Sequence, residues 1–145
     1  MATSTADNYN QQSMHSPYGN LSRRVATVAA LGTMAATDTL DLMKIPGGAF
    51  LTGGHVVIAT AVTTATLAIG VRYADGTSTG GTTGTAVLSG TGVALTTANA
   101  PQMLNFVPFE NDVDTIVYAT APNIAAPGAN IKLAVAIDYE DRGTK

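Results

Sequence analysis

The sequence predicts an all-β protein: an antiparallel β-sandwich, jelly-roll-like, with about eight short strands and an extended N-terminal arm. Three observations predict this fold class. Short segments rich in β-forming residues recur at a spacing of about 8 to 12 residues. Glycine and proline, which favour turns, occur between these segments. No stretch of helical length carries a stripe of large apolar side chains. The 145 residues suffice for one domain with a buried core.

The N-terminal segment differs from the rest of the chain, which predicts an arm over residues 1–23 and a sandwich domain over residues 24–145. Residues 8–20 are polar and follow neither a strand period nor a helix period. One interpretation is a disordered tail. The other is an arm held by a neighbouring subunit, and it requires anchoring side chains. The candidate contacts are Tyr9, Gln11, Met14, Tyr18, Arg23 and Arg24.

The predicted strands follow in chain order, each bounded by a turn signal. They cover residues 25–31, 39–43, 55–60, 66–73, 85–89, 103–107, 115–120 and 130–140. Turns are expected at residues 45–48 and at Gly53–Gly54. Residues 61–65 are expected to join two successive strands as a hairpin.

Alternation along the strands predicts which side chains face the core. In residues 39–43, Leu40 and Leu42 share one face and Asp41 lies on the other. The last strand alternates over its whole length, so we expect one packed face and one face that is exposed or contacts a neighbour. The side chains expected on its packed face are Ile131, Leu133, Val135, Ile137 and Tyr139.

A loop of Thr, Ser and Gly begins at Asp75 and Gly76 and includes Gly80 and Gly81. We expect this loop to be mobile or to pack on a partner. Its glycines do not indicate a phosphate site, because the Gly-Lys-Ser/Thr ending of a phosphate-binding loop is missing.

The composition favours closely packed sheets over a deep ligand pocket. The chain has 24 Ala, 22 Thr and 15 Gly, with three Phe and no Trp. Small and β-branched side chains suit pleated surfaces that pack closely on one another.

The charge pattern argues against nucleic-acid binding. Charged residues make up 12% of the chain, the net charge is −3, and the seven Lys and Arg are scattered. The absence of cysteine excludes disulfides and thiolate metal sites. We expect no signal peptide and no membrane span, so the protein would be made in the cytoplasm and act there or within a larger particle.

We find no catalytic signature in the sequence and expect neither an enzyme nor a cofactor. His15 and His55 are far apart, and each is better interpreted as a surface or packing residue. Carboxylates occur at every second position in Glu110, Asp112 and Asp114. This spacing is compatible with Ca²⁺ ligands, and it is equally compatible with the solvent-facing side of a strand. The sequence leaves open whether these three carboxylates bind an ion.

Four segments together resemble small structural proteins of tailed bacteriophages, the head decoration (cement) proteins. The resemblance spans residues 38–141 and is one of strands and turns. A strand ends in Ile-Pro-Gly-Gly, a Gly/Thr-rich loop follows later, and a long amphipathic strand ends near Asp-Tyr-Glu-Asp. The segments that carry it are residues 41–49, 54–58, 67–76 and 130–141.

This resemblance implies a β-sandwich on the outer surface of a phage capsid. Such a protein binds the major capsid protein, stabilises contacts between its subunits, and forms a homo-oligomer, with a trimer favoured over a dimer. It implies no nucleic acid, membrane or cofactor as partner. The alternative is a tail- or fibre-associated module that binds host carbohydrate, for which the candidate aromatic residues are Tyr73, Tyr118 and Tyr139.

Overall fold

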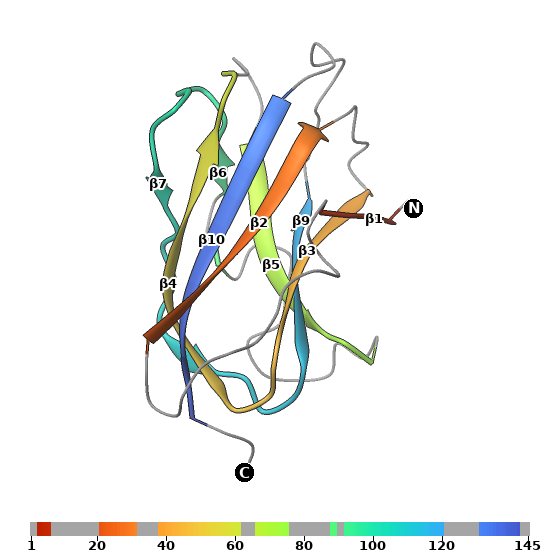
Figure 1. The fold of residues 1–145 in the computed structure, drawn as a ribbon, viewed down its shortest axis with the longest axis vertical. Helices are drawn as coiled ribbons and strands as arrows, with labels where there is room; N and C mark the ends of the chain where they lie inside the picture. The colour runs from red at the N-terminus through yellow and green to blue at the C-terminus, as the bar shows by residue number, and fades with distance from the viewer. Residues whose placement is uncertain are drawn as a thin grey trace.

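The all-β prediction is confirmed for the part of the chain that the structure describes. The structure is a computed structural model, and it describes residues 3–6, 21–31, 38–61, 66–75, 88–89, 92–120 and 131–142. Every regular element in these ranges is a β-strand (Figure 1). None of the described residues belongs to a helix that could cross a membrane.

Ten strands in the described part of the chain form two five-stranded layers. Their bounds are β1 Thr3–Thr5, β2 Leu21–Leu31, β3 Thr39–Ile45, β4 Ala49–Ile58, β5 Thr66–Tyr73, β6 Val93–Ala94, β7 Gln102–Met103, β8 Phe109–Glu110, β9 Thr115–Thr120 and β10 Ile131–Asp141. Sheet I has the order β1-β3-β9-β5-β6. Sheet II has the order β2-β10-β4-β7, with β8 also paired to β4.

Nearly all strand pairing is antiparallel, as the sequence predicts. The exception is β1, which runs parallel to β3 at the edge of sheet I, with Thr3 opposite Thr39. The Ala6 N–H donates to the Asp41 carbonyl at 2.6 Å, and Ala6 belongs to the hydrophobic core. Part of the predicted arm is therefore integrated into a sheet.

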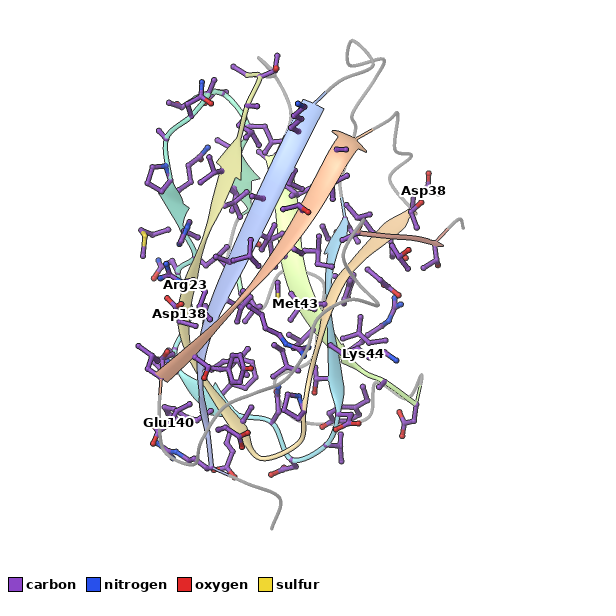
Figure 2. All side chains as sticks on the ribbon, viewed as in Figure 1. Arg23, Asp38, Met43, Lys44, Asp138 and Glu140 are labelled. Carbon is purple, nitrogen blue, oxygen red and sulfur yellow. The ribbon has the colours of Figure 1, made fainter. Side chains whose placement is uncertain are left out.

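The two sheets share one hydrophobic core, to which β2, β4 and β10 of sheet II and β3, β5 and β9 of sheet I all contribute. On β10 the side chains Leu133, Val135, Ile137 and Tyr139 are all buried, as the predicted alternation requires, but Ala136 on the opposite face is only 4% exposed. Met43 of β3 lies between the layers (Figure 2). Removing the surface of these apolar side chains from water is the main contribution to the stability of the fold.

A β-bulge changes the predicted alternation of β3. The pairing with β9 shifts between Asp41 and Met43, so Leu42 is the extra residue. Leu42 and Met43 are consecutive, yet both are fully buried in the core. The bulge thus adds an apolar side chain to the core that strict alternation would place outside.

Three local predictions are wrong. Strands β4 and β5 do not form the predicted hairpin, because they belong to different sheets. Gly53 and Gly54 do not end a strand, because β4 continues through both. The strand predicted at 103–107 is reduced to the two-residue β7. The predicted alternation of buried and exposed side chains is still observed in this segment, because Leu104 is buried while Met103 and Val107 are exposed.

The predicted strand at 85–89 lies largely outside the described residues. Its described part, Leu88 and Ser89, is a turn. Leu88 is fully buried, and the Ser89 hydroxyl accepts a hydrogen bond from the Ile69 N–H of β5 at 2.8 Å. This turn therefore closes over the core beside β5.

Candidate interaction surfaces

The outward side of sheet II forms a surface of small side chains with little charge. On β2, Arg24, Ala26 and Val28 face the core, so the residues between them point outward. The strand register places Val25, Ala136 and His55 in one row across β2, β10 and β4. A second row consists of Thr27, Ala134 and Val57. We call these six residues, with Arg23 and Asp138, the outer face of sheet II.

One end of this face contains a shallow hollow. It has a volume of 340 Å³ and is lined by side chains that include Thr27, Val57, Lys132 and Ala134. Apart from the Lys132 ammonium, the residues lining it are uncharged. The hollow gives an otherwise regular sheet face a concavity that a protein partner can fill.

Exposed large apolar side chains lie mainly at the two opposite ends of sheet II. Among the described residues they are Leu21, Val25, Met103, Val107 and Val113. Leu21 and Val25 belong to β2, while Met103 belongs to β7 and Val107 follows it. Because β10 and β4 lie between β2 and β7, these side chains do not form one continuous apolar patch.

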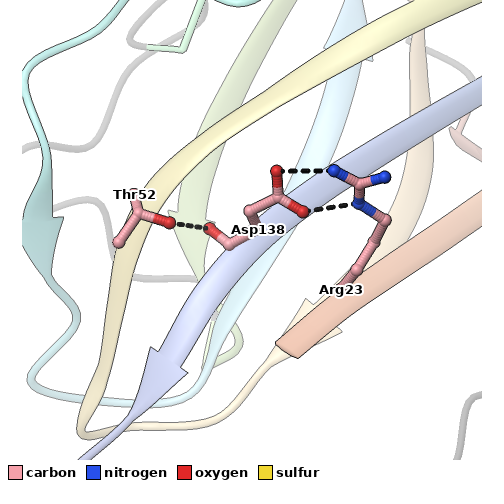
Figure 3. Close-up of polar contacts among 3 residues, drawn as sticks. All are labelled: Arg23, Thr52 and Asp138. Carbon is pink, nitrogen blue, oxygen red and sulfur yellow. Dashed lines mark hydrogen bonds and ion pairs between the residues drawn. The ribbon is translucent and has the colours of Figure 1, made fainter. Parts of the chain in front are cut away.

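The main charges on the outer face of sheet II neutralise each other. The Arg23 guanidinium donates two hydrogen bonds to the Asp138 carboxylate, at 2.6 and 3.0 Å (Figure 3). The Thr52 hydroxyl also donates to the Asp138 backbone carbonyl at 3.1 Å. The hydrogen bond from Arg23 lowers the pKa of Asp138. A paired arginine of this kind contributes little net charge to the surface that a partner meets.

Arg24, the other arginine of the predicted arm, points into the protein. Only 7% of it is exposed, and its guanidinium donates to the Lys44 backbone carbonyl on β3. Burial lowers the pKa of Arg24, and hydrogen bonding with Tyr139 opposes this effect. Arg24 therefore links the two sheets, and its guanidinium is held by internal partners, not offered to a capsid as the sequence suggested.

Most other predicted contact residues lie outside the described residues. These are Tyr9, Gln11, Met14 and Tyr18 of the arm, and Gly76, Gly80 and Gly81 of the loop. Asp75 is described, and it is exposed in the turn after β5. The arm and loop predictions therefore remain predictions.

The alternating carboxylates do not form a metal-binding group. Asp114 accepts a hydrogen bond from the Gly47 N–H at 3.0 Å, which fixes the turn between β3 and β4. Within the described ranges, no three His, Cys, Asp or Glu side chains converge as metal ligands would.

Two of the three tyrosines proposed for carbohydrate binding are buried. Tyr139 is 2% exposed and Tyr118 is 7% exposed. The Arg72 guanidinium lies over the Tyr118 ring, 5.1 Å from its centroid. An exposed aromatic platform is therefore not formed by Tyr118 and Tyr139.

A half-buried ion pair lies on the outward side of sheet I. Arg72 of β5 reaches across β9 to Asp41 of β3, and its Nη2 lies 2.6 and 2.7 Å from the two carboxylate oxygens. Asp41 is 6% exposed. Burial raises the pKa of Asp41, and Arg72 offsets this only in part.

The pKa of Asp41 should lie above the ordinary aspartate value, and the pKa of Asp138 should lie below it. The raised pKa of Asp41 means that its contribution to stability is present at low pH and is lost as the pH rises above about 4. The lowered pKa of Asp138 means that its contribution is lost as the pH falls below about 4. A pH titration followed by the NMR chemical shifts of the side-chain carboxyl carbons should give Asp41 a higher midpoint than Asp138. As a control, Arg23→Ala should raise the Asp138 midpoint only; the reverse order of midpoints would contradict this assignment.

Chains with a similar two-sheet all-β fold occur in solved phage capsid structures. The chain resembles one in the capsid of Ralstonia phage GP4, with a TM-score of 0.68 and 18% identity over 99% of each chain. It also resembles one in the cyanophage Pam1 capsid asymmetric unit, with a TM-score of 0.60 and 24% identity over 93% of this chain and 97% of that one.

A third similar chain belongs to the acidic stable capsid of Helicobacter pylori bacteriophage KHP30. The TM-score is 0.51 at 15% identity, over 86% of this chain and 94% of that one. No protein-family model and no curated protein sequence matches the chain. At these identities the likeness establishes a shared fold.

Proposed function

We propose that this chain is a virion structural protein, a decoration (cement) protein that binds the outer surface of a phage head and stabilises contacts between major capsid subunits. This proposal rests on the structural similarity to chains from phage capsids, which extends over nearly the full length of both compared chains. A match over 99% of each chain indicates a similar unit, not a shared fragment.

The strand order supports a jelly roll, a fold frequent in viral capsid domains. From β2 to β5 the successive strands alternate between sheet II and sheet I. The pattern returns at the end of the chain, where β9 lies in sheet I and β10 in sheet II. The first and last long strands, β2 and β10, pair with each other.

The outer face of sheet II is the surface we assign to the capsid contact. Its small side chains allow close approach of another protein, and the Arg23–Asp138 pair removes most of its charge. A weak contact of this kind gains strength when several copies bind together, because each bound copy raises the effective concentration of the next. A trimer with the N-terminal arm contacting a neighbouring subunit provides such multivalency.

Deleting residues 1–20 should abolish binding to phage heads that lack the protein, while the sandwich still unfolds cooperatively. The deletion removes the edge strand β1 and the core residue Ala6, and it leaves β2 intact, because that strand begins at Leu21. Binding is measured by co-sedimentation with the heads, and folding by urea denaturation. A matched variant with Tyr9, Met14 and Tyr18 changed to alanine keeps the arm length and tests the anchors. Full binding by the deleted protein would refute the role of the arm.

Cryo-electron microscopy of heads with and without added protein tests the proposed function itself. We expect additional density on the outer surface at symmetry-related positions. Density confined to the tail, or no density, would reject the decoration role.

A further inference from the structure

The hollow at one end of the outer face of sheet II is built by three neighbouring strands, β2, β10 and β4. A β-bulge lies beside it, because the pairing of β10 with β2 shifts between Ile131 and Leu133. On the other side of β10, the Ala59 N–H donates to the Lys132 backbone carbonyl at 2.9 Å. The volume of 340 Å³ stays open because much of the lining consists of small side chains, namely Ala29, Ala59 and Ala134.

Lys132 carries an unpaired positive charge at this hollow. The residue is exposed, and none of the ion pairs among the described residues involves its ammonium group. The other residues that line the hollow are uncharged. Arg23, on the same face, differs because Asp138 already neutralises it. Lys132 therefore presents to a partner a charge that its described neighbours do not neutralise.

The hollow is continuous with the surface that we assign to the capsid contact. Thr27, Val57 and Ala134 line the hollow and also form one of the two rows of the outer face of sheet II. A protein that covers this face therefore covers the hollow and removes water from the Lys132 ammonium. Burial of an unpaired charge has a large free-energy cost, which a carboxylate on the partner offsets.

The carboxylates of sheet II argue against a second copy of the chain as this partner. Two copies packed face to face with their β10 strands antiparallel would place Lys132 against the far end of the other β10 strand. The carboxylates at that end already have ion-pair partners. Asp138 is paired with Arg23 at 2.6 Å (Figure 2). Glu140 is paired with Arg142 at 3.1 Å. The carboxylate that Lys132 requires is therefore better supplied by a different protein.

We propose that the hollow receives an acidic side chain of a major capsid subunit, whose carboxylate binds the Lys132 ammonium. An apolar residue next to that acidic residue fills the uncharged part of the hollow. Asn99, which also lines the hollow, adds amide hydrogen-bond donors to the lining. This inference rests on the proposed function and specifies the chemistry of its partner.

Carbodiimide coupling on heads that carry the full chain identifies the partner of Lys132. The reagent activates a carboxylate, and a lysine amine in contact with that carboxylate displaces the reagent as a urea and forms an amide. Mass spectrometry should find Lys132 joined to an Asp or Glu of the major capsid subunit. Lys132→Arg keeps the charge but has no reactive amine, so this crosslink should disappear. A crosslink from Lys132 to another copy of this chain, or none to the capsid subunit, would overturn the proposal.

Charge substitutions measure the contribution of this contact to binding. Lys132→Glu should weaken binding to heads at least about thirtyfold, because two carboxylates then meet in the contact. Lys44→Glu makes the same charge change at an exposed position of β3, in the other sheet, and should bind as the unmodified protein does. Added salt should weaken binding of the unmodified protein more than binding of Lys132→Met, because salt screens the ion pair. Urea denaturation checks that each variant folds.

The two proposals fail in different ways. If the unmodified protein binds heads and Lys132→Glu binds them equally well, the role of the hollow is rejected and the decoration role stands. If the unmodified protein does not bind heads that lack it, the decoration role is rejected, and this inference with it.

Discussion

Gly54→Ala should destabilise the protein by about 3 kcal/mol, although it adds a single methyl group. A Cβ atom at Gly54 would lie 2.5 Å from the Ala136 carbonyl oxygen of β10. It would also lie 3.0 Å from the side chains of Ile137 and Leu104. The backbone oxygen cannot move without disturbing the β4–β10 pairing at the centre of sheet II. Urea denaturation at pH 7 measures the loss.

The neighbouring glycine provides the control. No atom lies within 4 Å of a Cβ built on Gly53. Gly53→Ala should therefore change the free energy of unfolding by less than about 1 kcal/mol, in the stabilising direction, because alanine loses less backbone entropy on folding. Equal losses for the two variants would show that the close approach of β10 at Gly54 is not what requires glycine.

Arg24→Ala should cost about 3 kcal/mol, while Arg23→Ala should cost less than about 1 kcal/mol. Removing the Arg24 guanidinium leaves the Lys44 carbonyl of the opposite sheet without this donor and leaves a void beside Tyr139. Arg23 is an exposed partner of Asp138, and water can replace it.

Arg24→Met separates the contributions of volume and charge. Burial lowers the pKa of Arg24, so holding this charge in the protein has a cost that methionine removes. The methionine variant should therefore lose less stability than the alanine variant, as measured by chemical denaturation of both. Similar stability losses for Arg24→Ala and Arg23→Ala would contradict the inter-sheet role of Arg24.

The fold class and the strongest strands could be predicted because alternation is a local signal. Residues 115–120 and 130–140 were expected as strands, and they form β9 and β10 nearly to the residue. Sheet membership depends on distant pairings instead. The short connection between β4 and β5 favoured a hairpin, whereas β4 pairs with β10 and β5 with β9.

The candidate surfaces were only partly visible in the sequence. The sequence predicts the low charge of the sheet faces, and Arg23, predicted as a contact residue of the arm, is exposed on β2. Arg24 was misinterpreted because it follows another arginine, although its alternation with Ala26 and Val28 was a signal of burial.

The pairing of β2 with β10 has a consequence for how the protein is made. The Arg23–Asp138 contact joins residues that are 115 positions apart, and Leu21 lies opposite Glu140. Sheet II can close only when the last strand has left the ribosome, and folds dominated by such distant contacts form slowly. Until then β4 lacks its central neighbour, and its apolar residues are exposed to other nascent chains.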